Sequence, residues 1–503
     1  MKNRWLNYLI LIFLGLAGLT VRIDVYPPIW FDEGYKLNAA YTLATEGVFG
    51  THTSSGLHPF DPLISSGPAD IGAIALSFKL FGAGIAQARL VIVLYALLAL
   101  ASLYRIAEYL YGPSLALFAC LLVLAAPPIQ GVSFLMLGRQ VLGEIPALAL
   151  ILFGLWMWFL SWEKHNIGFA AVSGLAIGLG LLSKNQLAFA LLPAMGIIAF
   201  VRFLKKPRLF WIMSMPILLA LAVQAGWTAV GWILTPDSIR GENYLLLKES
   251  IQIHVLTDLY GSNLTIQAIA MVQIMLFGSI AASIRLWFFT PVKDKNQSWA
   301  EALLVLIVIF TTIWFAWFSI GWPRYTFFGL VISWLFIGKV SWDTLKFINN
   351  KITKLNEGTR NSAVTMGIAS LAVVALATNI YPVVQSGGED PTKATVEYIQ
   401  ENIPEQELIE TWEWELGPLS GHMKIHHPHQ NYIFEAIRQT FHERKPFQLI
   451  YDPLQADPQY LITGPFSDWT RIYDTSLISE YFEEIAVIGP YRIYQRISNS
   501  LSR

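Results

Sequence analysis

Two adjacent carboxylates, Asp32 and Glu33, are the residues of this chain with the plainest potential for chemistry. They stand in the run WFDEGYKLNAA, just after two aromatic residues and just before a stretch that predicts an interfacial helix. A carboxylate at a membrane boundary can act as general base on a hydroxyl or an amine, a role worth about 10² to 10⁴ in rate. Acidic residues also favour the first turn of a helix, so a helix start is the alternative interpretation.

Other ionisable residues stand close to the ends of apolar runs. Later segments contribute Arg139, Glu144, Lys184 and Arg324, and the segment 22–84 contributes Arg22, Asp24, His52, His58, Asp61 and Asp70. A charge at the centre of a bilayer costs about 2.5 to 3.5 kcal/mol, so a set of charges at one boundary is expected to line a wet cavity. Each residue by itself could instead be an ordinary interfacial charge.

The aromatic residues beside the two carboxylates could contact a ligand. Trp30, Phe31 and Tyr35 would offer flat apolar faces to a sugar ring or to lipid. Aromatic residues are also enriched where helices meet the membrane surface, and that is their ordinary explanation.

The composition indicates which solvent surrounds most of the chain. Of 503 residues, 54% are hydrophobic and 14% charged, and the mean hydropathy is +0.49, which points to lipid rather than water. The formal net charge of −1 argues against nucleic acid as a partner, because a phosphate-binding surface needs a basic excess. Cys120 is the only cysteine, so no disulfide can form within the chain.

The apolar runs predict a polytopic α-helical membrane protein of about 11 transmembrane helices. A span needs roughly 17 to 25 apolar residues. Runs of this kind lie near residues 5–21, 85–109, 114–130, 142–162, 167–182, 186–203, 209–234, 264–289, 299–320, 325–343 and 361–384. The stretch from Ala69 to Phe81 is too short to span and predicts a helix that lies in the interface or re-enters.

Lysine and arginine in the short loops predict the orientation. With a cytoplasmic N-terminus, the inner loops hold most of the basic residues: Lys2, Arg4, Lys164, Arg202, Lys205, Lys206, Arg208, Arg285, Lys293, Lys295, Lys339, Lys346, Lys351, Lys354 and Arg360. An odd number of spans then places the C-terminus outside, and we expect a multi-pass protein of the plasma membrane. Merging the two spans beside Lys184 would invert everything after them.

We expect two domains, a transmembrane domain over residues 1–384 with a first outer loop at 22–84, and an extracytoplasmic α/β domain over 385–503. From Gln385 onwards there are 18 acidic and 9 basic residues, so the tail carries about −9 and the preceding part about +8. Helix-like stretches at Thr392–Asn402 and Ile433–Glu443 alternate with runs typical of strands: Glu407–Thr411, Gln448–Tyr451, Tyr460–Thr463 and Glu484–Pro490.

A histidine cluster in the tail, GHMKIHHPHQ, could bind zinc. It holds His422, His426, His427 and His429 and follows Glu413 and Glu415. Imidazoles and carboxylates are zinc ligands. The spacing is irregular and Pro428 interrupts it, so a solvated or acceptor-facing loop is favoured.

The sequence resembles a known family in several motifs. The run from SSGPADIGAIALSFKLFG to the arginine in AQARLVIVLY is similar to the glycine-proline, phenylalanine-glycine and arginine succession of the protein O-mannosyltransferase and aminoarabinose transferase superfamily, the lipid-linked-sugar glycosyltransferases of the GT-C fold. The first loop resembles their Asp-Glu motif. Weaker similarities are GRQVLGEIPAL, GLAIGLGLLSKNQ and WPRYTFF, and together the motifs cover residues 1 to about 384.

The resemblance implies an inverting transfer of a sugar from a polyprenyl-phosphate donor to an acceptor outside the cytoplasm. It implies Asp32 as general base with Glu33 beside it, and a phosphate site formed by Arg139, Lys184, Arg324 and Tyr325. The expected sugar or acceptor contacts are Trp30, Tyr35, Glu144, His58 and Asp61. Glu144 stands where many relatives have an aspartate. No cofactor is required, and a divalent metal has no support in the sequence.

The acceptor stays open between protein, lipid and glycan. A transporter or lipid flippase is the main alternative function, although transporters tend to place polar sites at the bilayer midplane and to contain repeats, and no repeat is visible. A receptor that acts through its soluble domain is a third possibility, and it leaves the acidic first loop unexplained.

Overall fold

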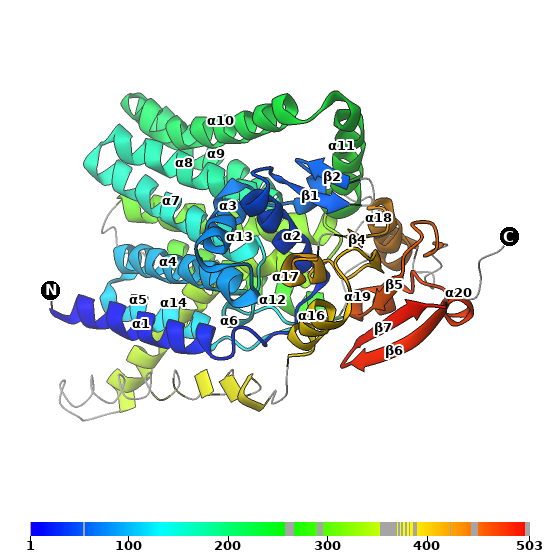
Figure 1. Ribbon diagram of the computed structural model, residues 1–503. Coiled ribbons are helices and arrows are strands. Elements are labelled where there is room, and N and C mark those ends of the chain that lie inside the picture. The colour runs from blue at the N-terminus through cyan, green and yellow to red at the C-terminus, as the bar shows by residue number, and fades with distance from the viewer. Residues whose placement is uncertain are drawn as a thin grey trace.

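The structure is a computed structural model that describes residues 2–53, 56–256, 266–288, 295–352, 390–422, 424–443 and 451–497, with a few more between 370 and 385. Its larger part is a bundle of helices that run side by side (Figure 1). Ten helices coincide with predicted spans: α1 (Lys2–Thr20), α4 (Ile85–Tyr111), α5 (Pro113–Ala125), α7 (Glu144–Lys164), α8 (Ile167–Ser183), α9 (Ala188–Lys205), α10 (Phe210–Leu234), α12 (Ile266–Phe288), α13 (Lys295–Trp317) and α14 (Phe327–Ile352).

Six described helical segments are long and apolar enough to cross a membrane, and four shorter helices are apolar as well. The prediction of a polytopic helical membrane protein is therefore confirmed. The last predicted span, 361–384, lies largely outside the described residues. The two spans beside Lys184 are separate helices, because α8 ends at Ser183 and α9 begins at Ala188 after the short 3-10 helix η2 (Asn185–Leu187).

The segment after α1 forms a small layer at one end of the bundle. It contains α2 (Phe31–Thr45), the antiparallel hairpin of β1 (Gly50–Thr53) and β2 (Gly56–Pro59), the 3-10 helix η1 (Pro62–Ile64) and α3 (Pro68–Phe81). Helix α3 confirms that the stretch Ala69–Phe81, predicted to lie in the interface or to re-enter, is a short helix. The same end also carries α6 (Phe134–Leu137), α11 (Asp237–Ser250), the π-helical turn η4 (Ile251–Val255) and the 3-10 helix η5 (Pro323–Thr326). A further 3-10 turn, η3 (Pro207–Leu209), links α9 to α10.

The C-terminal part is the expected α/β domain, built on a mixed sheet of order β4-β3-β5-β7-β6. Its strands are β3 (Ile409–Thr411), β4 (Ile425–His426), β5 (Tyr460–Thr463), β6 (Phe482–Ile488) and β7 (Tyr491–Arg496), and its helices are α16 (Pro391–Asn402), α17 (Leu416–Ser420), α18 (Asn431–Ile437), the π-helical η6 (Arg438–Glu443), α19 (Pro465–Thr470) and α20 (Thr475–Tyr481). Strands β4, β3 and β5 are parallel, whereas β7 pairs antiparallel with β5 and β6.

Three of the four strand predictions fall on observed strands. The fourth, Gln448–Tyr451, lies outside the described residues except for Tyr451, which forms an isolated bridge with Tyr473. The sequence analysis missed β4 and β7. Strand β4 is only two residues long, and β7 follows β6 after a tight turn at Gly489, whose φ of +58° suits glycine.

The C-terminal domain packs directly on the first-loop layer (Figure 1). Its buried Trp412, Trp414 and Phe434 belong to the same hydrophobic cluster as the membrane helices. A second, smaller core lies on the sheet around Ile409, Ile462 and Ile493. The closest approach is at Gly34 of α2, where an added Cβ would lie 2.7 Å from the backbone nitrogen of Glu415. The two domains therefore form one packed unit around α2.

Candidate active site

A cavity of about 480 Å³ lies where the helix bundle, the first-loop layer and the C-terminal domain meet. Its charged wall contains Asp32, Lys36, Glu144, Lys184 and Arg324. These residues come from α2, the start of α7, the α8–α9 turn and η5, which are far apart in the sequence. The prediction that charges from several helix ends line one cavity is confirmed for this set.

Ion pairs hold the charged wall together. Arg324 donates to both carboxylate oxygens of Asp32, at 2.8 and 3.2 Å. Lys184 Nζ lies 2.7 Å from Glu144 Oε1, and Arg324 Nε lies 3.8 Å from the same oxygen. Two cations and two carboxylates thus form one chain of charges, and an incoming anion could take both cations from their carboxylates.

The electrostatics of Asp32 follow from this pairing. Burial raises its pKa, but the adjacent guanidinium of Arg324, together with Lys36 and Lys184, leaves the pKa below its ordinary value. Asp32 is therefore ionised at neutral pH, and 29% of its side chain is exposed. An ionised, accessible carboxylate at a cavity wall can accept a proton.

Glu33 plays a different part from its neighbour. Its side chain is 1% exposed and is held by Arg89, which donates to its two oxygens at 3.0 and 2.7 Å, while the backbone N–H of Val141 donates at 2.8 Å. Arg89 also donates to the carbonyls of Ile23 and Pro27. Although Glu33 borders the cavity, these bonds occupy its carboxylate, so its position supports an anchoring role rather than a catalytic one.

Arg139 lies away from the charged wall. Its guanidinium donates to the carbonyls of Gly18 and Val21 at the end of α1. Arg139 is not among the residues that line the cavity, so its position gives no support to the predicted phosphate role. A buried arginine can satisfy its five N–H donors with helix-end carbonyls, and the sequence does not distinguish this use from phosphate binding.

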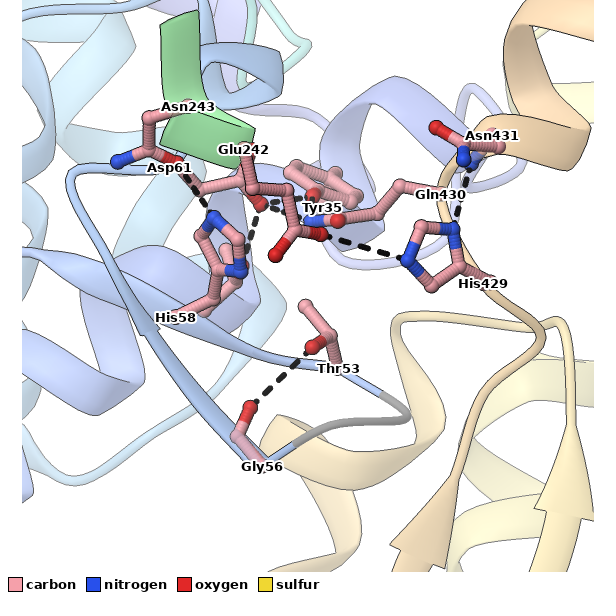
Figure 2. A network of polar contacts seen from close by, with 11 residues as sticks. Tyr35, Thr53, Gly56, His58, Asp61, Glu242, Asn243, His429, Gln430 and Asn431 are labelled. Carbon is pink, nitrogen blue, oxygen red and sulfur yellow. Dashed lines mark hydrogen bonds and ion pairs between the residues drawn. The ribbon is translucent and has the colours of Figure 1, made fainter. Parts of the chain in front are cut away.

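Tyr35, His58 and Asp61 were predicted as sugar or acceptor contacts, but they form a network between the two domains instead (Figure 2). Asp61 accepts from Tyr35 Oη, from Gln430 Nε2 and, at 2.7 Å, from Thr51 Oγ1. Ring nitrogen Nε2 of His58 lies 2.5 Å from Asn243 Oδ1. The network joins α2, the β1–β2 hairpin, α11 and the segment before α18, and none of these three residues borders the cavity.

The remaining predicted residues do border the cavity. Tyr325 packs against the charged wall, with Lys184 Nζ 4.9 Å from its ring centroid, and Trp30 lines the same cavity. Sequence analysis missed Lys36, Gln186 and His254. Lys36 follows Asp32 by four residues, one helical turn, and that spacing could have identified it. His254 lies in η4, where burial lowers its pKa to about 4 and keeps it neutral.

The histidine cluster forms no metal site within the part of the chain that the structure describes, where no group of three or more His, Cys, Asp or Glu side chains is placed to hold an ion. His427 is buried with Nδ1 2.7 Å from the carbonyl of Thr411 and stacks on Trp414. Burial lowers its pKa to about 3. His426 contacts Glu410 at 2.5 Å, and His429 contacts Glu242 at 3.3 Å. The four histidines thus serve packing and domain contacts.

Part of the chain is similar in sequence to a known protein family. Residues 71–227 match the family model of dolichyl-phosphate-mannose-protein mannosyltransferase. No curated protein matches the chain significantly by sequence.

Solved structures match over the whole length. ArnT from Cupriavidus metallidurans, bound to undecaprenyl phosphate, is 14% identical with a TM-score of 0.64, and the match covers 98% of each chain. The oligosaccharyltransferase AglB from Archaeoglobus fulgidus, in complex with an inhibitory peptide and a dolichol-phosphate, is 13% identical with a TM-score of 0.52, covering 100% of this chain and 75% of AglB. This chain therefore has the GT-C fold of ArnT and AglB, and its residues 71–227 are similar in sequence to the dolichyl-phosphate-mannose-protein mannosyltransferases.

Proposed function

We propose that this protein is an inverting glycosyltransferase that moves a sugar from a polyprenyl-phosphate donor to an extracytoplasmic acceptor. The observation that carries the proposal is the charged wall, where Lys184 and Arg324 are paired with Glu144 and Asp32 at the membrane end of the cavity. Two similarities support this donor class. The fold of the chain is similar to that of ArnT bound to undecaprenyl phosphate, and residues 71–227 match the dolichyl-phosphate-mannose-protein mannosyltransferase family model.

The donor fits the surroundings of the two cations. A small pocket of about 10 Å³ adjoins the charged wall at Glu144, Lys184, Arg324 and Tyr325, and the rest of its lining includes the apolar side chains of Leu187, Trp314, Phe327 and Phe328. A polyprenyl phosphate has an anionic head and a hydrocarbon tail. The head would bind at Lys184 and Arg324, and the tail would lie among the apolar side chains of the membrane helices beside these cations, where its burial is favourable.

The charged wall then supports a single displacement, with its carboxylate acting on the acceptor and its cations acting on the leaving phosphate. An acceptor oxygen or nitrogen attacks the anomeric carbon from the side opposite the phosphate, and the bond from that carbon to the phosphate oxygen breaks. Asp32 takes the acceptor's proton, and Lys184 and Arg324 stabilise the negative charge that gathers on the departing phosphate. When Arg324 turns toward the phosphate, Asp32 loses the partner that lowers its pKa and becomes a stronger base.

Replacing the proposed base tests the mechanism. We expect Asp32→Asn to reduce transfer by about 10² to 10⁴, because the amide cannot accept a proton. The measurement is the movement of radiolabel from a panel of polyprenyl-phosphate sugars onto acceptors in membranes that contain the full chain. Asp24→Asn is the control, since Asp24 is an exposed carboxylate of the same loop outside the cavity. Full turnover by Asp32→Asn would show that Asp32 is not the general base. If the native protein moves intact donor across the membrane without transferring its sugar, it is a flippase.

We further propose that the cavity and the C-terminal domain face outward from the cytoplasm. The cavity lies at the Glu144 end of α7, whereas Lys164 ends the same helix about 30 Å away, and basic residues concentrate at that far end. Cys120 is fully buried, so a single introduced cysteine can be read against a silent background. We expect an impermeant maleimide to label Ser476→Cys in intact cells and to leave Lys164→Cys unlabelled until the membrane is opened. The reverse pattern would contradict the orientation.

A further inference from the structure

Part of the cavity wall is aromatic and comes from both domains. Trp30 precedes α2, and Phe466 and Trp469 belong to α19 of the C-terminal domain. The Trp30 ring centroid lies 5.8 Å from that of Phe466 and 6.1 Å from that of Trp469, and the rings of Phe466 and Trp469 stack at 5.9 Å. We call these three residues the aromatic wall, and all three line the cavity.

The aromatic wall is held in place from behind. Phe466 stacks on Phe31 with a centroid separation of 4.2 Å and an interplanar angle of 16°, and its edge meets buried Trp412 at 5.5 Å. Glu413 fixes the start of α19, since it accepts from the backbone N–H groups of Phe466 and Ser467, at 3.2 and 2.9 Å, and from Ser467 Oγ at 2.9 Å. The rings are therefore oriented before any ligand binds, which reduces the entropy lost on binding.

The two tryptophans keep a large accessible surface inside this packed arrangement. Trp30 is 37% exposed and Trp469 is 39% exposed, whereas Phe466 between them is 4% exposed. Trp30 is two residues from Asp32, so their Cα atoms are at most about 7 Å apart. Trp30, Trp469 and Asp32 line the same cavity, so a ligand that fills it can contact both the rings and the carboxylate that faces Arg324.

Resting on the proposed function, we propose that the aromatic wall is the acceptor subsite and that its ligand is a sugar ring of a carbohydrate acceptor. A pyranose has an apolar face of C–H groups that can lie flat on tryptophan, and a rim of hydroxyls. The same cavity offers Asp32, Lys36 and Gln140 to those hydroxyls. An acyl chain would leave these polar groups without partners in a partly closed cavity, which is unfavourable. The acceptor is thus a glycan or the sugar headgroup of a glycolipid.

Binding of defined saccharides to the full chain in lipid nanodiscs tests this subsite. The probes are chitotriose, maltotriose and mannotriose, a short-chain glycolipid with the headgroup of the best of these, and a serine-containing hexapeptide, followed by saturation-transfer NMR. We expect at least one trisaccharide to receive saturation at its ring C–H protons. Trp469→Ala should weaken that binding about two- to tenfold, the range of a lost aromatic contact, and Trp469→Phe should retain most of it. Trp211→Ala is the control, since Trp211 is an exposed tryptophan on α10 outside the cavity, and it should change nothing.

The outcomes separate the subsite from the function. Tighter binding of the glycolipid than of its saccharide would identify a headgroup, and equal binding a free glycan. If no saccharide binds, if only the peptide binds, or if Trp469→Ala and native protein bind alike, the acceptor subsite is refuted. Undecaprenyl phosphate is titrated into the same preparation: its normal binding alongside any of these results refutes the subsite alone, and its failure to bind refutes the proposed function. If Trp469→Ala does not fold, Trp30→Ala takes its place.

Discussion

Carboxylates gather in two regions of this molecule, and their partners differ. In the cavity, Asp32 and Glu144 are paired with the cations Arg324 and Lys184. Behind the aromatic wall, Glu413 and Glu415 are fully buried, Glu413 accepting from the start of α19 and Glu415 from Tyr491 Oη at 2.8 Å. A phosphate can compete for a cation, but nothing in the cavity can compete for backbone N–H groups behind it. The cation-paired acids are therefore suited to chemistry, and the N–H-bonded and hydroxyl-bonded acids to positioning.

Glu33 tests this comparison most severely, because it is a cation-paired carboxylate that lies next to Asp32 yet is buried. We expect Glu33→Ala to destabilise the protein by about 3 to 5 kcal/mol, since it leaves the guanidinium of Arg89 buried without its counter-ion. Asp32→Asn should leave the midpoint of thermal unfolding nearly unchanged while transfer is lost. Midpoints are measured on the full chain in nanodiscs.

The double variant Glu33→Gln with Arg89→Met is the control for that experiment. It removes both charges while keeping most of the volume, so it should recover part of the lost stability. If Glu33→Ala is as stable as the native protein but inactive, Glu33 is catalytic. The assignment of catalysis to Asp32 and of anchoring to Glu33 would then be wrong.

The contrast between Asp32 and Glu33 also shows how far sequence reasoning reaches. Apolar length predicted the described spans, since a lipid-facing helix needs about 20 apolar residues wherever it packs. It also brought Asp32, Glu144, Lys184 and Arg324 to one boundary. Whether a charge then faces a cavity or a neighbouring helix depends on rotations that hydrophobic length does not determine, so Arg139 and Glu33 could not be told apart from Arg324 and Asp32.

The C-terminal domain was harder to foresee than the membrane part. Strand-like runs predicted a mixed α/β domain, but the contribution of Phe466 and Trp469 to the cavity depends on docking between distant segments. Gly34 is the residue that permits this docking, and in the sequence it reads only as part of a helix start. Tyr35, His58 and Asp61 were misplaced for the same reason, because a polar residue at a domain contact has the same composition signal as one in a binding site.

The buried pair behind the aromatic wall predicts a pH dependence. Burial and the adjacent Glu415 raise the pKa of Glu413 to about 8. Burial raises the pKa of Glu415 to about 7. Because the folded state holds these protons more tightly than the unfolded state, their contribution is full below the ordinary pKa near 4.5 and is lost as pH rises through 7 and 8. We expect stability to fall between pH 6 and pH 9, by an amount on the order of 2 kcal/mol.

Glutamine at position 413 isolates that effect, because an amide imitates the protonated acid. The thermal midpoint of Glu413→Gln should vary less with pH than that of the native chain, and Glu484→Gln, an exposed acid of β6, should vary as the native chain does. Undecaprenyl phosphate binding should be unchanged in Glu413→Gln, since Glu413 is not among the residues that line the cavity. Stability that rises from pH 6 to pH 9 would contradict the assignment.

The smallest expected effect belongs to a carboxylate that has a cation partner but no burial. Arg492 donates to Glu484 at 3.1 Å on the face of the C-terminal sheet, where both side chains are well exposed to water. Water screens this attraction and the two long side chains lose freedom when they pair, so the net stabilisation is close to zero. We expect Arg492→Ala to leave the thermal midpoint within the scatter of replicate measurements on the full chain. This pair, like Asp32 with Arg324, joins a carboxylate to a guanidinium. A marked loss of stability in Arg492→Ala would therefore show that such a pair stabilises the protein even where water surrounds it. The two regions would then differ because of the charge of each carboxylate's partner, and not because of how far each carboxylate is buried.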